Sequence, residues 1–142
     1  FEKIHQKRAK FLSRGDNSGT HIKELKIWNE AEIYNLSIEQ EWYFESGSGM
    51  GATLNMAVQN SAYTLCDRST WISFKNKSNH TILLADTKNL INNYGIVLLN
   101  EDKYPKLNHS GARKLSEWLL SKKGQSAIEG FKVNNQQMFF TQ

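Results

Sequence analysis

The residues of this sequence best suited to chemistry lie in the segment Ser13–His21, which reads Ser-Arg-Gly-Asp-Asn-Ser-Gly-Thr-His. Arg14 carries a fixed positive charge and a planar set of N–H donors that matches the oxygens of a tetrahedral oxyanion. Ser18 and Thr20 add hydroxyl groups that can rotate toward an acceptor. These residue types indicate a binding site for an oxyanion.

A strand and a helix are expected to position this segment. Phe11 and Leu12 are typical of a strand end, and the sequence from about Ser18 to Ala31 or Glu32 has helical spacing. The expected apolar face of that helix consists of Ile22, Leu25, Trp28 and Ala31. The first N–H groups of a helix lack intrahelical partners, and the helix dipole makes that end electropositive, so a helix N-terminus attracts anions.

The same residues also have a plainer interpretation. Asp, Asn, Ser and Thr are ordinary N-cap residues. Asp16 can therefore simply cap the helix, and Arg14 can pair with Asp16 in the absence of any ligand. The segment by itself leaves both interpretations open.

A second segment repeats the arrangement. Trp42–Glu45 is rich in strand formers, Ser46–Thr53 contains three glycines, including Gly49 and Gly51, and Leu54–Asn60 has helical spacing. Two helix N-termini directed into one cleft would bind an anion better than one. The alternative is an ordinary turn, because the segment lacks the Gly-Lys-Ser/Thr ending of a nucleotide P-loop.

The rest of the chain predicts further alternation of strands and helices. Strands are expected over Ala62–Leu65, Thr81–Ala85 and Gly95–Leu99, with a short helix capped by Asp67. Asn108 or Ser110 is expected to cap a helix that carries four apolar residues, Ala112, Leu115, Trp118 and Leu119. This order of elements favours an α/β layer architecture.

Composition narrows the function classes. With 142 residues, 39% of them hydrophobic and 23% charged, the chain suits one ordinary domain. The net charge of +4 favours anionic partners without choosing between nucleic acid and small anions. The single cysteine, Cys66, is expected to be a buried free thiol, and the four histidines have no metal-ligand spacing. The start at Phe1 is interpreted as a cut inside a longer protein or a processed end.

The segment Ser13–His21 resembles the second-lobe anion motif of the tungstate-binding proteins of ABC transporters, which are periplasmic solute-binding proteins related to phosphate-binding proteins. The resemblance continues along nearly the whole chain. It includes Gly49–Leu54, Ala62–Leu65 with Asp67 and Arg68, Asn93–Gly95, Ser116–Leu119, Lys123–Gln125 and Phe139–Phe140.

This resemblance implies an α/β fold, a type II periplasmic-binding-protein-like lobe of three layers with a mixed sheet and flanking helices. Residues 1–104 would form the second lobe, and residues 105–142 a helical segment that returns to a first lobe absent from this chain. The family's oxyanion ligands would be Arg14, Ser18, Gly19 and Thr20, with the loop glycines Gly49 and Gly51. Asp16 would orient Arg14.

The implied function is the substrate-binding component of an ABC transporter for tungstate or molybdate, and not an enzyme. No cofactor is expected, no metal except tungsten within the oxyanion, and no nucleic acid. The expected location is periplasmic, or extracellular and membrane-anchored, with an ABC permease as partner. The chain alone would bind tungstate weakly or not at all, and uncovered apolar residues could pair two copies of it.

Alternatives remain. A phosphate, sulfate or molybdate binder would use the same fold, although a phosphate site gains from an acceptor for the proton that phosphate carries. An enzyme acting on phosphorylated substrates would need a base near Arg14, and His21 is the candidate within reach. A sensor domain could keep the fold without transport.

Overall fold

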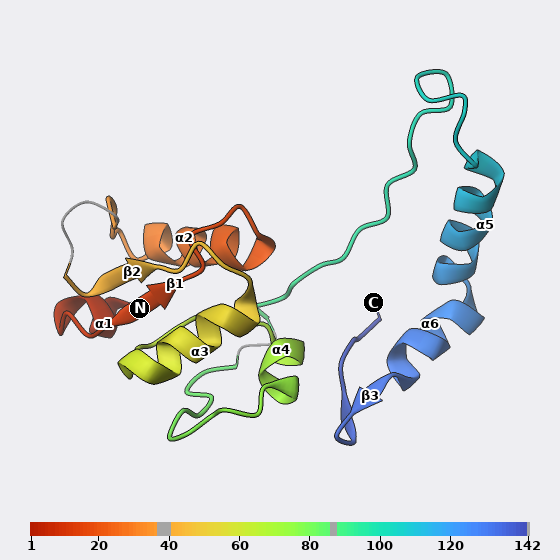
Figure 1. Cartoon of the computed structure of the whole chain (residues 1–142). Coiled ribbons are helices and arrows are strands. Elements are labelled where there is room, and N and C mark those ends of the chain that lie inside the picture. Colours follow the sequence, from red (N-terminus) through yellow and green to blue (C-terminus); the bar gives the residue numbers. More distant parts are fainter. Residues whose placement is uncertain (37–40, 86–87, 142) are drawn as a thin grey trace. The chain divides into compact units, whose positions relative to one another are not determined.

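The computed structural model describes residues 1–36, 41–85 and 88–141, which divide into two compact units, Phe1–Asn92 and Asn93–Gln142 (Figure 1). The loop expected over residues 35–40 lies mostly outside the described residues. The first unit contains α1 (Glu2–Gln6), β1 (Phe11–Ser13), α2 (Gly19–Glu30), β2 (Tyr43–Glu45), α3 (Met50–Asn60) and α4 (Arg68–Ser73). The second contains α5 (His109–Leu120), α6 (Lys122–Gly130), β3 (Lys132–Val133) and β4 (Gln136–Gln137).

Strand β1 is the centre of the sheet in the first unit. It pairs in parallel with β2, with Phe11 opposite Tyr43 and Ser13 opposite Glu45. On the other edge of β1, Tyr63 forms a parallel bridge with Phe11, and the Leu12 N–H donates to the Tyr63 carbonyl at 2.8 Å. The strand expected over Ala62–Leu65 is therefore reduced to one bridging residue.

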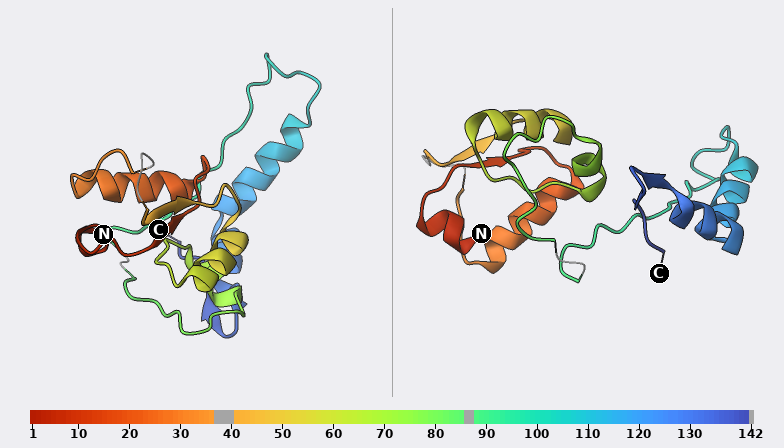
Figure 2. Two further views of the ribbon diagram at one scale, coloured as in Figure 1. Left: turned by 60° about the vertical axis from the view of Figure 1, so that its left-hand side comes forward. Right: turned by 90° about the horizontal axis from the view of Figure 1, so that it is seen from below.

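Helices cover both faces of this sheet, α2 on one side and α3 on the other (Figures 1 and 2). Successive strand residues point to opposite faces, so Phe11 packs with Trp28 of α2 while Leu12 packs with Ala57 of α3. The Phe11 and Trp28 rings meet edge to face at 5.2 Å. The α/β fold class and the three-layer arrangement are confirmed.

The predicted apolar face of α2 is only partly right. Trp28 is completely buried, but Ile22 is 60% exposed and Leu25 is 42% exposed. The residue that takes the buried position beside Trp28 is Glu24. Helix spacing alone ranks a carboxylate as a surface residue, and here hydrogen bonds described below satisfy it in the interior.

The predicted strands at Thr81–Ala85 and Gly95–Leu99 are wrong. Both segments are irregular, and their side chains are exposed. A strand depends on a neighbour for its main-chain hydrogen bonds, and within the described residues the sheets contain only β1 with β2 and β3 with β4. Their apolar composition met the sequence criterion without a pairing partner.

The second unit begins its helices with side-chain caps. Asn108 accepts a hydrogen bond from the Gly111 N–H at 2.9 Å, which confirms one of the two caps expected for α5. Ser121 ends α5 and caps α6 through the Gly124 N–H. A Cβ on Gly124 would lie 2.0 Å from the Trp118 carbonyl oxygen, so only glycine fits at this junction.

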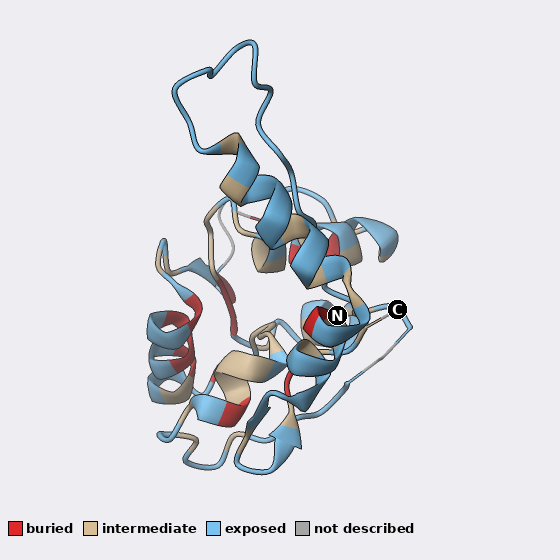
Figure 3. Cartoon of the chain, turned by 90° about the vertical axis from the view of Figure 1, so that its right-hand side faces the viewer, coloured by how far each residue is buried: buried red, intermediate tan, exposed pale blue. Residues whose placement is uncertain are grey.

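Helix α5 contains no buried residue, and it is drawn almost entirely in the exposed and intermediate colours of Figure 3. The described residues form a boundary between compact units after Asn92. The assignment of residues 1–104 and 105–142 to different lobes stays a prediction. Among the described helices, none has the length and apolar character needed to cross a membrane.

Candidate oxyanion site

Two loops meet at one edge of the sheet because β1 and β2 are parallel. The first loop (residues 14–18) connects β1 to the N-terminus of α2, and the second loop (residues 46–49) connects β2 to the N-terminus of α3. Ligands of α/β folds bind at this carboxyl edge of the strands. The arrangement places the two predicted segments together.

Ser46 joins the two loops. Its N–H donates to the Ser13 carbonyl at 2.9 Å, and its hydroxyl donates to the Arg14 carbonyl at 3.2 Å. The same hydroxyl lies 2.7 Å from Thr53 Oγ1 in the first turn of α3. Side chains of the second loop and α3 therefore fix the main chain of the first loop.

Gly15 allows the close approach of the first loop to β2. Its φ of +60° lies in the left-handed region that favours glycine. A Cβ at this position would lie 2.6 Å from the Glu45 Cβ. Any larger residue would move the loop away from the strand and carry Arg14 with it.

Arg14 is held from one side and unsatisfied on the other. Its Nη2 lies 2.5 Å from Asp16 Oδ2, and its buried Nε has no hydrogen-bond partner among the described residues. Hydrogen bonds from Ser18 hold the pKa of Asp16 below its ordinary value, with a further contribution from Arg14. Asp16 is thus an ionised partner that fixes the guanidinium and leaves a donor for another group.

The N-terminus of α2 follows directly. Ser18 is the N-cap, and its hydroxyl oxygen accepts the His21 N–H at 3.2 Å. Gly19 and Thr20 are the first two helical residues, whose N–H groups lie in the turn without intrahelical acceptors. The hydroxyls and N–H groups predicted from the sequence therefore lie within one helical turn of each other.

The glycines of the second segment occupy different positions. Gly49 is the N-cap of α3 and Gly51 lies in its first turn. A Cβ added to either one would meet no atom within 4 Å. Crowding within the described residues does not require glycine at either position, and the space beside the N-terminus of α3 is open.

A cluster that sequence reasoning missed lies directly behind the first loop. We call it the Glu24 cluster, and it consists of Ser13, His21, Glu24, Trp28 and Tyr43. Glu24 accepts hydrogen bonds from the Ser13 hydroxyl at 2.7 Å, the Tyr43 hydroxyl at 2.8 Å and the Trp28 Nε1 at 3.2 Å. Its members come from β1, α2 and β2, so no local sequence pattern could have assembled it.

The donors of the Glu24 cluster determine its charge state. Trp28 can only donate, and an ionised carboxylate only accepts, so the geometry suits ionised Glu24. Burial nevertheless raises the pKa of Glu24, and the hydrogen bonds from Ser13, Tyr43 and Trp28 oppose that shift. Burial, together with the charge of Glu24, raises the pKa of Tyr43, which stays protonated as a donor.

A pH dependence of stability follows from this buried carboxyl group. The pKa of Glu24 is raised from 4.5 in the folded state, so the folded chain binds more protons than the unfolded chain above that pH. The contribution of protonated Glu24 is complete below pH 4.5 and is lost as the pH rises through the folded pKa. Relative to Glu24→Gln, we expect the free energy of unfolding of the wild type to fall over this range.

Urea denaturation at a series of pH values from 4.5 upward measures this difference. Glu30→Gln is the matched control, because Glu30 lies on the same helix and is 63% exposed. The slope of the control should follow that of the wild type. A difference between wild type and Glu24→Gln that is flat or rises with pH would contradict the assignment.

Other chemistry finds little support around the loops. The Ser13 hydroxyl lies 3.0 Å from His21 Nδ1, but Ser13 is completely buried and cannot reach a substrate. Burial raises the pKa of Cys66 to about 12, so its thiol is protonated and unreactive at neutral pH. Among the described residues, no group of three or more His, Cys, Asp or Glu is arranged to hold a metal ion.

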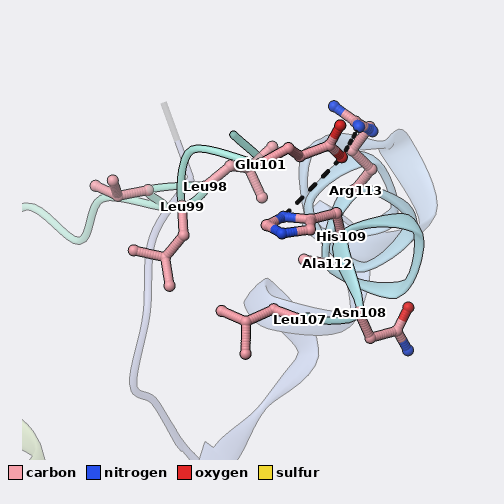
Figure 4. A pocket seen from close by; sticks show the side chains of 9 residues that line it. Leu98, Leu99, Glu101, Leu107, Asn108, His109, Ala112 and Arg113 are labelled. Carbon is pink, nitrogen blue, oxygen red and sulfur yellow. Dashed lines mark hydrogen bonds and ion pairs between the residues drawn. The ribbon is translucent and has the colours of Figure 1, made fainter. Parts of the chain in front are cut away.

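The second unit contains a cavity of about 220 Å³, shown in Figure 4. Leu98, Leu99 and Leu107 provide its apolar lining. Its cations are already paired with a carboxylate, because Glu101 forms ion pairs with Arg113 and His109. This cavity lacks the unpaired donors that an oxyanion needs.

Comparisons with known proteins agree with this geometry. The sequence profile of the PBP superfamily domain matches residues 1–123. The chain is 43% identical over 127 residues to the tungstate-binding protein TupA of Peptoclostridium acidaminophilum, covering 89% of this chain and 43% of that protein.

Two solved structures are similar to the chain. The tungstate ABC transporter structure from Geobacter sulfurreducens has a TM-score of 0.78 and 39% identity, covering 90% of this chain and 53% of that one. The tungstate-binding protein TupA from Desulfovibrio alaskensis G20 has a TM-score of 0.75 and 36% identity, covering 97% of this chain and 56% of that one. The chain thus spans about half the length of these relatives.

Proposed function

Since the chain belongs to the PBP superfamily, we propose that it is the oxyanion-binding lobe of an ABC transporter's solute-binding component and that its ligand is tungstate. The observation that carries the proposal is Arg14, whose buried Nε has no described partner at the edge where two helices begin. The names of the similar proteins support tungstate. An ABC permease is the proposed membrane partner, and the proposed location is periplasmic or extracellular and membrane-anchored.

The proposed binding mode uses donors only. Arg14 supplies charge and its Nε–H, Ser18 and Thr20 supply hydroxyl groups, and the first turns of α2 and α3 supply main-chain N–H groups. In this mode Gly19 contributes an N–H at the start of α2, and Gly49 and Gly51 leave open access to α3.

The acceptor groups nearby are already engaged. Asp16 accepts hydrogen bonds from Arg14 and from the Ser18 N–H, so it has little capacity for a protonated ligand. Tungstate carries no proton at neutral pH, whereas phosphate usually carries one. The site therefore favours tungstate over phosphate, and molybdate, which has the same charge and shape, is the closest competitor.

The rest of the site is proposed to come from a first lobe. Because the chain spans about half of its relatives, the opposite wall of the anion site would be provided by residues outside this sequence. An enzymatic function is disfavoured by the burial of Ser13 beside His21. Pairing of two copies through exposed apolar side chains stays a prediction from the sequence.

Calorimetric titration of the full-length gene product that carries this chain tests the proposal. Tungstate and molybdate are expected to bind tightly at a ratio of 1:1, and phosphate to bind at least about tenfold more weakly because its proton meets no free acceptor. Sulfate serves as an unprotonated anion of smaller size. A preference for phosphate would contradict the donor-only site.

The isolated chain of 142 residues provides a second arm of this experiment. If the opposite wall comes from another lobe, the isolated chain binds tungstate weakly or not at all. Tight binding by the isolated chain would show that the described loops form a complete site.

A further inference from the structure

We propose that Glu24 is a positioning residue for the first loop, acting through Ser13 on the main chain next to Arg14. This inference rests on the proposed function, because it assigns a role in oxyanion binding to a residue that does not reach the ligand. The argument depends on the direction of each hydrogen bond in the Glu24 cluster.

Ser13 has a single hydroxyl hydrogen, and Glu24 receives it. The Ser13 Oγ donates to Glu24 Oε2 at 2.7 Å, so it must act as acceptor in its other contacts. It accepts the Gly15 N–H at 3.2 Å, and His21 Nδ1 lies 3.0 Å away as the remaining donor. The ionised carboxylate therefore sets the direction of the entire chain of hydrogen bonds.

That chain ends on the peptide group between Arg14 and Gly15. The N–H of this peptide is held by the Ser13 hydroxyl, and its carbonyl is held by the Ser46 hydroxyl at 3.2 Å. With both polar atoms fixed, the peptide plane cannot rotate freely. The orientation of this plane determines where the Arg14 side chain leaves the main chain.

The two oxygens of Glu24 serve different parts of the molecule. Oε1 accepts from Tyr43 and Trp28 in the core. Oε2 accepts from Ser13 on the loop side and lies 4.0 Å from His21 Nδ1. This division separates a stabilising role in the core from a positioning role toward the loop.

The division also provides matched variants. Glu24→Gln keeps the shape of the side chain but replaces one acceptor oxygen with an N–H donor, which must face a donor on either side of the cluster. Ser13→Ala removes the hydroxyl that connects Glu24 to Gly15. Tyr43→Phe removes one buried hydrogen bond of the same carboxylate on the side away from the loop.

The experiment measures tungstate affinity by calorimetry and melting temperature by circular dichroism, using the full-length gene product. Ser13→Ala and Glu24→Gln are expected to weaken tungstate binding about tenfold, which corresponds to one lost buried hydrogen bond. Tyr43→Phe is expected to lower the melting temperature comparably and to leave the affinity within about twofold of the wild type. A purely structural role would not separate affinity from melting temperature in this way.

The outcomes distinguish the two proposals. A wild type that does not bind tungstate overturns the proposed function. A wild type that binds, with Ser13→Ala and Glu24→Gln binding as tightly as Tyr43→Phe, overturns the positioning role alone. If Glu24→Gln does not fold, Ser13→Ala still decides, because it interrupts the same connection without placing a donor in the core.

Discussion

Replacing Arg14 with alanine is expected to weaken tungstate binding by the full-length gene product about 100-fold. The substitution removes a charge-assisted hydrogen bond worth up to about 3 kcal/mol, and a change of 1.4 kcal/mol corresponds to a factor of ten in affinity. It also leaves Asp16 at the edge of the site without its partner, so an uncompensated negative charge would face the anion. Calorimetric titration measures the loss.

Two variants separate charge from geometry. Arg14→Lys keeps the charge without the planar arrangement of donors, so an intermediate loss of about tenfold is expected. Lys26→Ala is the charge-matched control, because Lys26 is exposed and pairs only with Glu30 on the surface of α2. If Lys26→Ala weakens binding as much as Arg14→Ala, general electrostatics rather than Arg14 holds the anion.

Replacing Trp28 with alanine is expected to reduce the free energy of unfolding of the first unit by about 3–5 kcal/mol. Trp28 is completely buried, and its ring contacts Phe11, Trp42 and Tyr43 at centroid distances of 5.2, 5.7 and 6.4 Å. Removing the ring leaves a cavity between α2 and the sheet and takes one donor from Glu24. Urea denaturation followed by circular dichroism measures the change.

Trp118→Ala is the control of identical chemistry. Trp118 lies on α5 and is 44% exposed, so its removal is expected to cost about 1 kcal/mol or less. Equal losses for the two substitutions would argue against the assigned core. Such a result would mean that the aromatic cluster contributes no more than an ordinary surface residue.

The sequence predicted those parts of the fold that depend on neighbouring residues. Ser18 and Asp67 cap α2 and α4 through hydrogen bonds to N–H groups three residues ahead, and such caps are visible in local sequence. The order of β1, first loop and α2 was predictable for the same reason. The site residues at the loops follow from this order.

The sequence did not predict features that depend on distant partners. Thr81–Ala85 has a composition suited to a strand, but composition does not say whether another strand is available to pair with it. Glu24 was missed because its burial depends on donors from positions 13, 28 and 43, which approach each other only in the folded unit. Local patterns predict elements and their ends, whereas buried polar clusters arise from tertiary packing.

The helix N-termini at the sheet edge have a consequence for the evolution of such a site. Their donors are main-chain N–H groups, which every residue except proline supplies. Most substitutions in the first turns of α2 and α3 therefore leave these donors in place. Under the proposed function, ligand preference then depends on a few side chains, Arg14, Ser18 and Thr20, and a lineage can change its oxyanion at those positions while keeping its fold.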